Sequence, residues 1–179
     1  MVYRWYTDTN YRIKTIILAY GVWYIVKSCF FIGHRDAPER IQTQLTTAVE
    51  RLIVEENVGY FYVGQYGSFD RMAALTVKQM KRKYPYISLY LVLPYHPAER
   101  PVPAPVGFDG TYYPEGMETV PKRYAIVRAN KQLVKSSDWL LVYVCHPGSN
   151  ARNLLEYAQR REQKGLIHIE NLAGGTYEY

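Results

Sequence analysis

The chain has 179 residues, enough for one α/β domain with a sizeable core and short for two domains. Its apolar content of 48% is that of a globular protein and argues against disorder. The formal net charge is +6, but residues 1–27 alone contribute +3 through four basic residues and one acidic residue. No run of like charges exceeds Lys81-Arg82-Lys83, so the composition does not favour a nucleic-acid-binding protein.

Residues 1–26 are predicted to form an N-terminal extension outside the main domain. The apolar run of residues 15–26 is too short to span a bilayer, so no membrane association is expected. No small-residue cleavage site follows it before Lys27, which argues against an export signal. Three interpretations stay open: an added hairpin, an added helix packed on the domain, or an over-extended start of the reading frame.

Residues 29–32 are predicted to form a short buried strand that stops at a glycine. A helix start follows, in which Asp36 can cap, Pro38 suits the first turn and Glu39 can reach back to the cap amide. Free N–H groups and the helix dipole favour an anion between such a strand and such a helix. This first junction contains Gly33, His34 and Arg35.

A second junction follows a predicted helix at 37–56 and a predicted strand at 60–63. Gly64 and Gly67 let the backbone approach a phosphate or a sugar closely, and Ser68 can cap the next helix. Asp70 would repel a phosphate and suits ribose hydroxyls. The alternative is a turn and a cap in which Asp70 only complements the helix dipole.

The remaining pattern continues the alternation of helices and strands. Helices are predicted at 69–84, 121–136 and 151–164, and strands at 87–93, 138–144 and 166–169. The Pro- and Gly-rich segment 94–121 has no periodicity and is interpreted as a lid over the crevice or as a disordered insertion. A third strand-to-helix junction contains Gly148, Ser149 and Asn150.

These elements predict an α/β fold, a Rossmann-like, doubly wound, mostly parallel five-stranded sheet with helices on both faces. The predicted domain covers 27–173, followed by a tail at 174–179. With the strands numbered along the chain, the order 3-2-1-4-5 places a ligand crevice outside the carboxyl ends of strands one and four. The three junctions would then meet at one edge of the sheet.

Six pieces of the sequence also resemble a known family. They are CFFIGHRDAP, FYVGQYGSFDRMA, YPYISLYLVLPY, YPEGMETVPKRYAI, SSDWLLVYVCH and LLEYA. In this order they resemble the YpsA-like (YspA) family of the SLOG group, which also contains the DprA and LOG proteins. The resemblance covers about residues 27–173. It implies a Rossmann-like fold that binds a nucleotide or a nucleotide-derived ligand.

Carried over position by position, the resemblance implies a pocket at Gly33, His34, Arg35, Gly64, Gly67, Phe69 and Asp70. Asn130 matches the asparagine of the family's Arg-Asn pair, but Ala129 precedes it and the arginine is displaced to Arg128. The family's tryptophan and two glycines after strand four are replaced here by Gly148, Ser149 and Asn150. The phosphate end of the pocket therefore departs from the family pattern.

The first functional hypothesis is a sensor or regulatory module for an ADP-ribose-like small molecule. Arg35 and the junction amides would hold phosphate, Asp70 would bind ribose, and Tyr66 or Phe69 would stack on the base. The alternative is a nucleotide N-glycosidase or phosphoribohydrolase related to LOG enzymes, with Asp70 and Glu156 as catalytic candidates. Nucleic-acid binding ranks last.

Cys29 and Cys145 fall at predicted strands and are interpreted as buried, reduced thiols of a cytoplasmic protein. The four histidines show no metal-ligand spacing, so no metal is predicted, and no cofactor besides the nucleotide-derived ligand. Exposed aromatic residues are compatible with a homo-oligomer.

Overall fold

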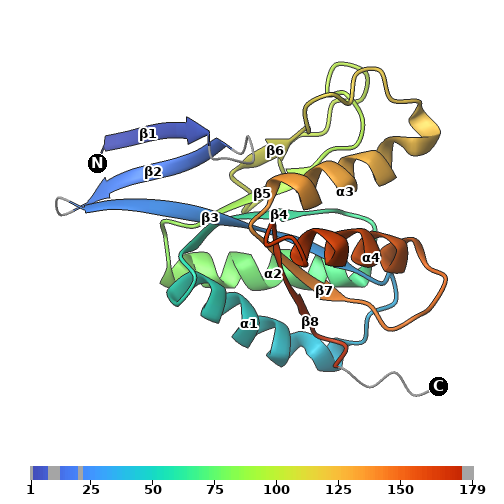
Figure 1. The fold of residues 1–179 in the computed structure, drawn as a ribbon, viewed down its shortest axis with the longest axis horizontal. Coiled ribbons are helices and arrows are strands. Elements are labelled where there is room, and N and C mark those ends of the chain that lie inside the picture. The colour runs from blue at the N-terminus through green and yellow to red at the C-terminus, as the bar shows by residue number, and fades with distance from the viewer. Residues whose placement is uncertain (1, 8–12, 20–21, 175–179) are drawn as a thin grey trace.

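The protein is described by a computed structural model that covers residues 2–7, 13–19 and 22–174 (Figure 1). The strands are β1 Val2–Thr7, β2 Ile13–Ala19, β3 Val22–Gly33, β4 Val58–Val63, β5 Ser88–Val92, β6 Gly110–Tyr112, β7 Trp139–Tyr143 and β8 His168–Asn171. The α-helices are α1 Gln42–Val54, α2 Ser68–Lys83, α3 Ala125–Ser136 and α4 Asn150–Glu162. Short 3₁₀ turns at Glu39–Ile41 and Lys122–Tyr124 lead into α1 and α3.

The parallel part of the sheet has the order β6-β5-β4-β3-β7-β8. This arrangement confirms the doubly wound α/β fold and the predicted order of its five long strands. The difference is a sixth parallel strand, β6, which pairs with β5 inside the segment predicted to be a loop. Three residues are too few to show a strand period, so only pairing with β5 reveals this strand.

The N-terminal extension contains two strands in its described residues. β1 and β2 pair antiparallel, and β2 continues antiparallel along the first part of β3, with Thr15 opposite Val26. The boundary predicted after residue 26 therefore lies inside β3. Residues 1, 8–12 and 20–21 of this extension lie outside the described residues, as do 175–179 of the predicted tail.

Two apolar cores lie on opposite faces of the sheet. Side chains alternate along β3, so Phe31 packs with the buried residues of α1 and α2, whereas Phe30 and Ile32 pack with those of α3 and α4. Both faces of β3 and β7 are therefore buried, as expected for central parallel strands with near-continuous apolar sequences. Figure 1 shows α1 and α2 side by side beneath the sheet.

Two of the predicted helix caps are wrong. Asp36 was predicted to cap the helix, but it is exposed, and the residue at the cap position of the 3₁₀ turn before α1 is Pro38, which makes no side-chain cap hydrogen bond. Gly67 precedes α2, and the Ser68 hydroxyl donates to the carbonyl oxygens of Arg35 and Ala37, each at 2.9 Å. These carbonyls come from the neighbouring junction, so the sequence around Ser68 could not indicate that its hydroxyl would act as a donor across the sheet edge.

The two cysteines differ in burial. Cys29 is fully buried in β3, and burial raises the pKa of its thiol. Cys145 is exposed, so the prediction of a buried thiol is wrong there. The reason is that β7 ends at Tyr143, which leaves Cys145 in the loop beyond the sheet.

Among the described residues, no helix combines the length and the apolar character needed to cross a bilayer.

Candidate functional site

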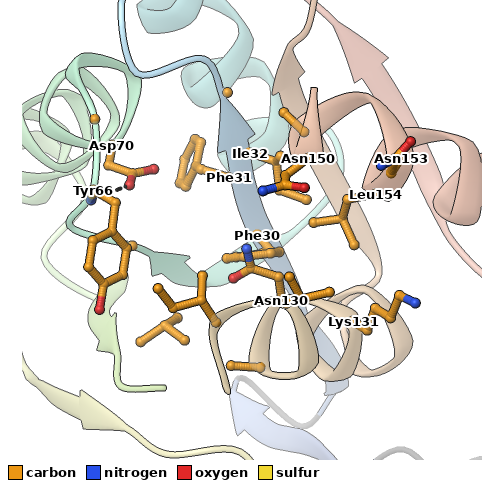
Figure 2. Close-up of a pocket in the computed structure, with 18 of the residues that line it drawn as sticks. Phe30, Phe31, Ile32, Tyr66, Asp70, Asn130, Lys131, Asn150, Asn153 and Leu154 are labelled. Atoms are coloured by element: carbon orange, nitrogen blue, oxygen red, sulfur yellow. Dashed lines mark hydrogen bonds between the residues drawn. The ribbon is translucent and has the colours of Figure 1, made fainter. Parts of the chain in front are cut away.

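A cavity of about 530 Å³ lies at the carboxyl ends of the central strands and continues between α3 and α4 (Figure 2). Its volume is in the range of small-molecule sites. Nine of the residues singled out from the sequence line it, and these come from every junction and from both helices. They are Gly33, Arg35, Gly64, Tyr66, Gly67, Asp70, Asn130, Asn150 and Glu156.

The first two junctions are locked against each other. A Cβ atom on Gly33 would lie 2.3 Å from Cγ of Phe69, and one on Gly67 would lie 2.7 Å from Cα of Arg35. The backbone N–H of Ser68 donates to the carbonyl oxygen of Arg35 at 2.9 Å. Both glycines are therefore needed for close packing, which fixes the wall of the cavity formed by the ends of β3 and β4.

Asp70 presents a carboxylate on this wall. Its Oδ2 accepts a hydrogen bond from the backbone N–H of Tyr66 at 2.8 Å, which Figure 2 shows as a dashed line. Burial raises the pKa of Asp70, and hydrogen bonds from the Tyr66 and Gly67 amides partly offset this rise. A Cβ atom on Gly64 would lie 2.8 Å from Oδ2, so this glycine leaves the space that the carboxylate occupies.

His34 lies beside the cavity and does not line it. Its ring is buried, and Nε2 accepts hydrogen bonds from the backbone N–H groups of Cys145 at 2.9 Å and His146 at 3.0 Å. Burial lowers the pKa of His34, followed in importance by the charge of His146, so the neutral ring is favoured. The side chain thus fastens the loop after β7 to the end of β3.

His34 also brings metal-ligating atom types together. Ligand atoms of His34, Cys145 and His146 lie within 4.8 Å of one another, although 111 and 112 positions separate His34 from the other two. Sequence spacing cannot show such a cluster, because β3 and β7 are neighbours only in the folded sheet. Nε2 already accepts two N–H groups, which places the ring proton on Nδ1. His34 would have to give up both hydrogen bonds to ligate a metal through Nε2, so the absence of a metal stays a prediction.

The third junction contributes less than the first two. Gly148 is exposed with a φ of +72°, and a Cβ atom there would meet nothing within 4 Å. The Ser149 Oγ accepts the N–H of Arg152 at 3.1 Å and caps α4. Asn150 alone of the three lines the cavity. The predicted site residues outside the cavity lining are His34, Ser68, Phe69, Gly148 and Ser149.

Phe69 has no exposed surface, so its ring is closed to a ligand in this structure. Tyr66 is 38% exposed and lines the cavity, which leaves it as the available aromatic ring at the strand ends. Of the segment 94–121, all of which is described, only Pro94 lines the cavity. The segment therefore does not cover the crevice as a lid.

Sequence reasoning identified Asn130, Asn150 and Glu156 on the helices but missed most of the other helical residues of the cavity. The missed residues include Ile126, Val127, Lys131, Asn153, Leu154, Tyr157 and Arg160. Asn153, Tyr157 and Arg160 recur at intervals of four and three, which places them on one face of α4. That spacing was a usable signal, but the sequence alone does not show that this face points toward α3.

Comparison with solved structures supports the fold. The chain is similar to DNA processing protein A (DprA) from Streptococcus pneumoniae, with a TM-score of 0.60 and 13% sequence identity. The match covers 86% of this chain and 52% of the DprA chain, so this chain spans about half the length of DprA. At this identity the likeness shows the fold alone, and that fold is the Rossmann-like one that the SLOG resemblance implies. No family model matches the sequence, and no curated protein matches it either. Membership of the YpsA-like family stays a prediction.

Proposed function

We propose that the protein is a cytoplasmic module that binds a nucleotide-derived small molecule, of the ADP-ribose type, at the carboxyl ends of its strands. In this proposal the molecule acts as a sensor or regulator. Arg35 holds phosphate, Asp70 accepts hydrogen bonds from ribose hydroxyls, and the Tyr66 ring stacks on the base.

The observation that carries the proposal is one continuous cavity that contains Gly33, Arg35, Gly64, Asp70 and Asn150. These residues come from three separate strand-to-helix junctions. In open α/β sheets, ligands bind outside the carboxyl ends of the strands where the strand order reverses, and here that point lies between β3 and β7.

A thermal-shift panel of AMP, ADP, NAD and ADP-ribose tests the proposal. We expect at least one compound to raise the melting temperature, because a ligand that binds only the native state stabilises it. The Gly64→Val variant should lose this shift, because its side chain displaces the Asp70 carboxylate. Gly110→Val, in β6 and outside the cavity, is the matched control and should keep it.

Asp70→Asn is a second variant that keeps the shape of the side chain and removes its charge. It should weaken ribose-containing ligands and leave the fold intact, as judged by circular dichroism. A panel without any shift, or a Gly64→Val variant that keeps every shift, would show that the proposed site is wrong.

The burial of Asp70 favours one second candidate function, a nucleotide N-glycosidase. A carboxyl group with a raised pKa in a cavity is suited to proton transfer, and a carboxylate beside the sugar can stabilise an oxocarbenium-like transition state. Glu156 also lines the cavity, but its Oε1 lies 3.0 Å from Nε of Arg152, and this pairing makes Glu156 the weaker candidate.

Release of free base from nucleoside monophosphates, followed by chromatography, tests this second candidate. Release that disappears in Asp70→Asn would support an enzyme. If wild-type protein that binds a nucleotide releases no base over a long incubation, the site is a binding site only.

A further inference from the structure

The cavity has two arms, and the proposed function uses only one. The strand arm consists of the wall residues from the first two junctions, namely Gly33, Arg35, Gly64, Tyr66, Gly67 and Asp70. The helix arm lies between α3 and α4 and is lined by Ile126, Val127, Lys131, Leu154, Tyr157 and Arg160. Figure 2 shows Tyr66 and Asp70 on one side of β3, with Leu154 and Lys131 toward the other.

The helix arm has an excess of positive charge. Among the described residues, no carboxylate forms an ion pair with Lys131 or Arg160. Glu156, the acidic residue in this arm, is paired with Arg152 at 3.0 Å. Two cations therefore face a space whose one carboxylate is already neutralised by a neighbour on the same helix.

The surrounding segment has the same character. Residues 122–164 contain nine Lys and Arg residues and three Asp and Glu residues, a net charge of +6, so the remainder of the chain sums to zero. This segment forms α3, β7 and α4, and β7 lies inside the sheet. Within this segment α3 carries a net charge of +3 and α4 a net charge of +1, so the two helices that form this arm hold +4, which creates a field that attracts an anion.

The helix arm also offers apolar surface. Ile126 and Val127 are 37% and 42% exposed, although most apolar residues on this face of the sheet are buried. The Lys131 Nζ lies 5.7 Å from the centre of the Tyr157 ring, which joins a cation to an aromatic surface. Apolar and aromatic walls with cations at the rim suit a base or a sugar that carries a phosphate.

We propose that the helix arm binds a second phosphate-bearing part of the ligand. The ligand class is then an elongated nucleotide with two separated anionic groups, such as a 5′-phosphorylated dinucleotide, and not a mononucleotide. This inference rests on the proposed function, because the helix arm is continuous with the strand arm in one cavity.

Isothermal titration calorimetry of the full chain with AMP and with the 5′-phosphorylated dinucleotide of two adenylates tests the inference. We expect the dinucleotide to bind about tenfold more tightly, the effect of one additional charge-assisted contact. The double variant Lys131→Gln/Arg160→Gln should lower dinucleotide affinity to that of AMP while AMP affinity changes by less than about twofold.

The matched control is Lys135→Gln/Lys164→Gln, which removes the same charge from exposed positions outside the cavity. It should leave both affinities unchanged. Equal affinities of wild-type protein for AMP and the dinucleotide would overturn the helix-arm inference and leave the proposed function standing. An equal loss of dinucleotide affinity in both double variants would also overturn it, because the charge effect would then be nonspecific. If AMP, the dinucleotide and ADP-ribose all fail to bind, both the helix-arm inference and the proposed function are wrong.

Discussion

The junctions after β3 and β4 differ from the junction after β7 in how tightly their backbones are held. The first two contact each other directly, through Phe69 against Gly33 and through Gly67 against Arg35. The third is exposed at Gly148, with open space where a side chain would be. The predicted resemblance to the YpsA-like pattern lies at the first two junctions and not at the third. The difference teaches that a glycine pattern in the sequence is easiest to recognise at junctions where close packing leaves no room for a side chain.

Of the substitutions that test this difference, Phe69→Ala should have the largest effect on the free energy of unfolding. The ring is fully buried and packs near Phe31 and Tyr143, so its removal should lower the free energy of unfolding by about 4 kcal/mol. Urea denaturation followed by circular dichroism measures this change. A loss below about 1 kcal/mol would contradict the account of the locked junctions.

Gly33→Ala should cost about 3 kcal/mol, because its Cβ would overlap the Phe69 ring. In the Phe69→Ala background, the same substitution should cost less than about 1 kcal/mol, since the overlapping atoms are gone. The same denaturation experiments on both single variants and the double variant complete the cycle. Additive losses would mean that the two residues do not act through this contact.

His34→Leu should lower the free energy of unfolding by about 2 kcal/mol, because the N–H groups of Cys145 and His146 lose their acceptor. It tests the link between the third junction and the first. Leu keeps the apolar contacts of the ring with Tyr143 but cannot accept a hydrogen bond.

The lowered pKa of His34 also makes the free energy of unfolding depend on pH. The pKa of His34 is lower in the folded chain than its ordinary value of 6.5, so the unfolded chain binds more protons between the two pKa values. The contribution of neutral His34 to stability is therefore complete above pH 6.5 and is lost as the pH falls through the folded pKa. His146 opposes protonation of His34 and Asp36 favours it. Denaturation at a series of pH values should show this loss in the wild type, and His34→Leu should lack it.

Ser149→Ala should have the smallest effect, about 1 kcal/mol, because it removes the cap of α4 and leaves the locked junctions untouched. Gly148→Ala is the companion variant and should also cost about 1 kcal/mol, from the left-handed backbone and not from a clash. Both are measured as losses in the free energy of unfolding. A larger effect at either position than at Gly33 would reverse the comparison.

Local sequence rules placed the long elements correctly and failed at their connections. The strands β4, β5 and β7 and the last part of β3 are short apolar runs bounded by glycine or polar residues, which a window of the sequence can show, whereas the start of β3 was assigned to the extension. The cap at Asp36 and the buried thiol at Cys145 were wrong, because both depend on where a neighbouring element ends. β6 was missed for a different reason: its three residues form a strand only through pairing with β5.

The candidate site divides in the same way. The sequence indicated the strand arm, because glycines and a carboxylate after parallel strands must meet at one edge of the sheet. It did not indicate the helix arm, because Lys131 and Arg160 are ordinary solvated residues until α3 and α4 are placed side by side.

By itself, the sequence determined the alternation of apolar runs and glycine stops, and hence the parallel sheet and the edge at which its junctions meet. Only the tertiary structure decided which side chains share a cavity, that His34 holds the loop after β7 against the end of β3, and that Lys131 and Arg160 line the same space. The physical reason is range: periodicity and turn chemistry act over a few residues, whereas contacts such as that between His34 and Cys145 join positions 111 residues apart.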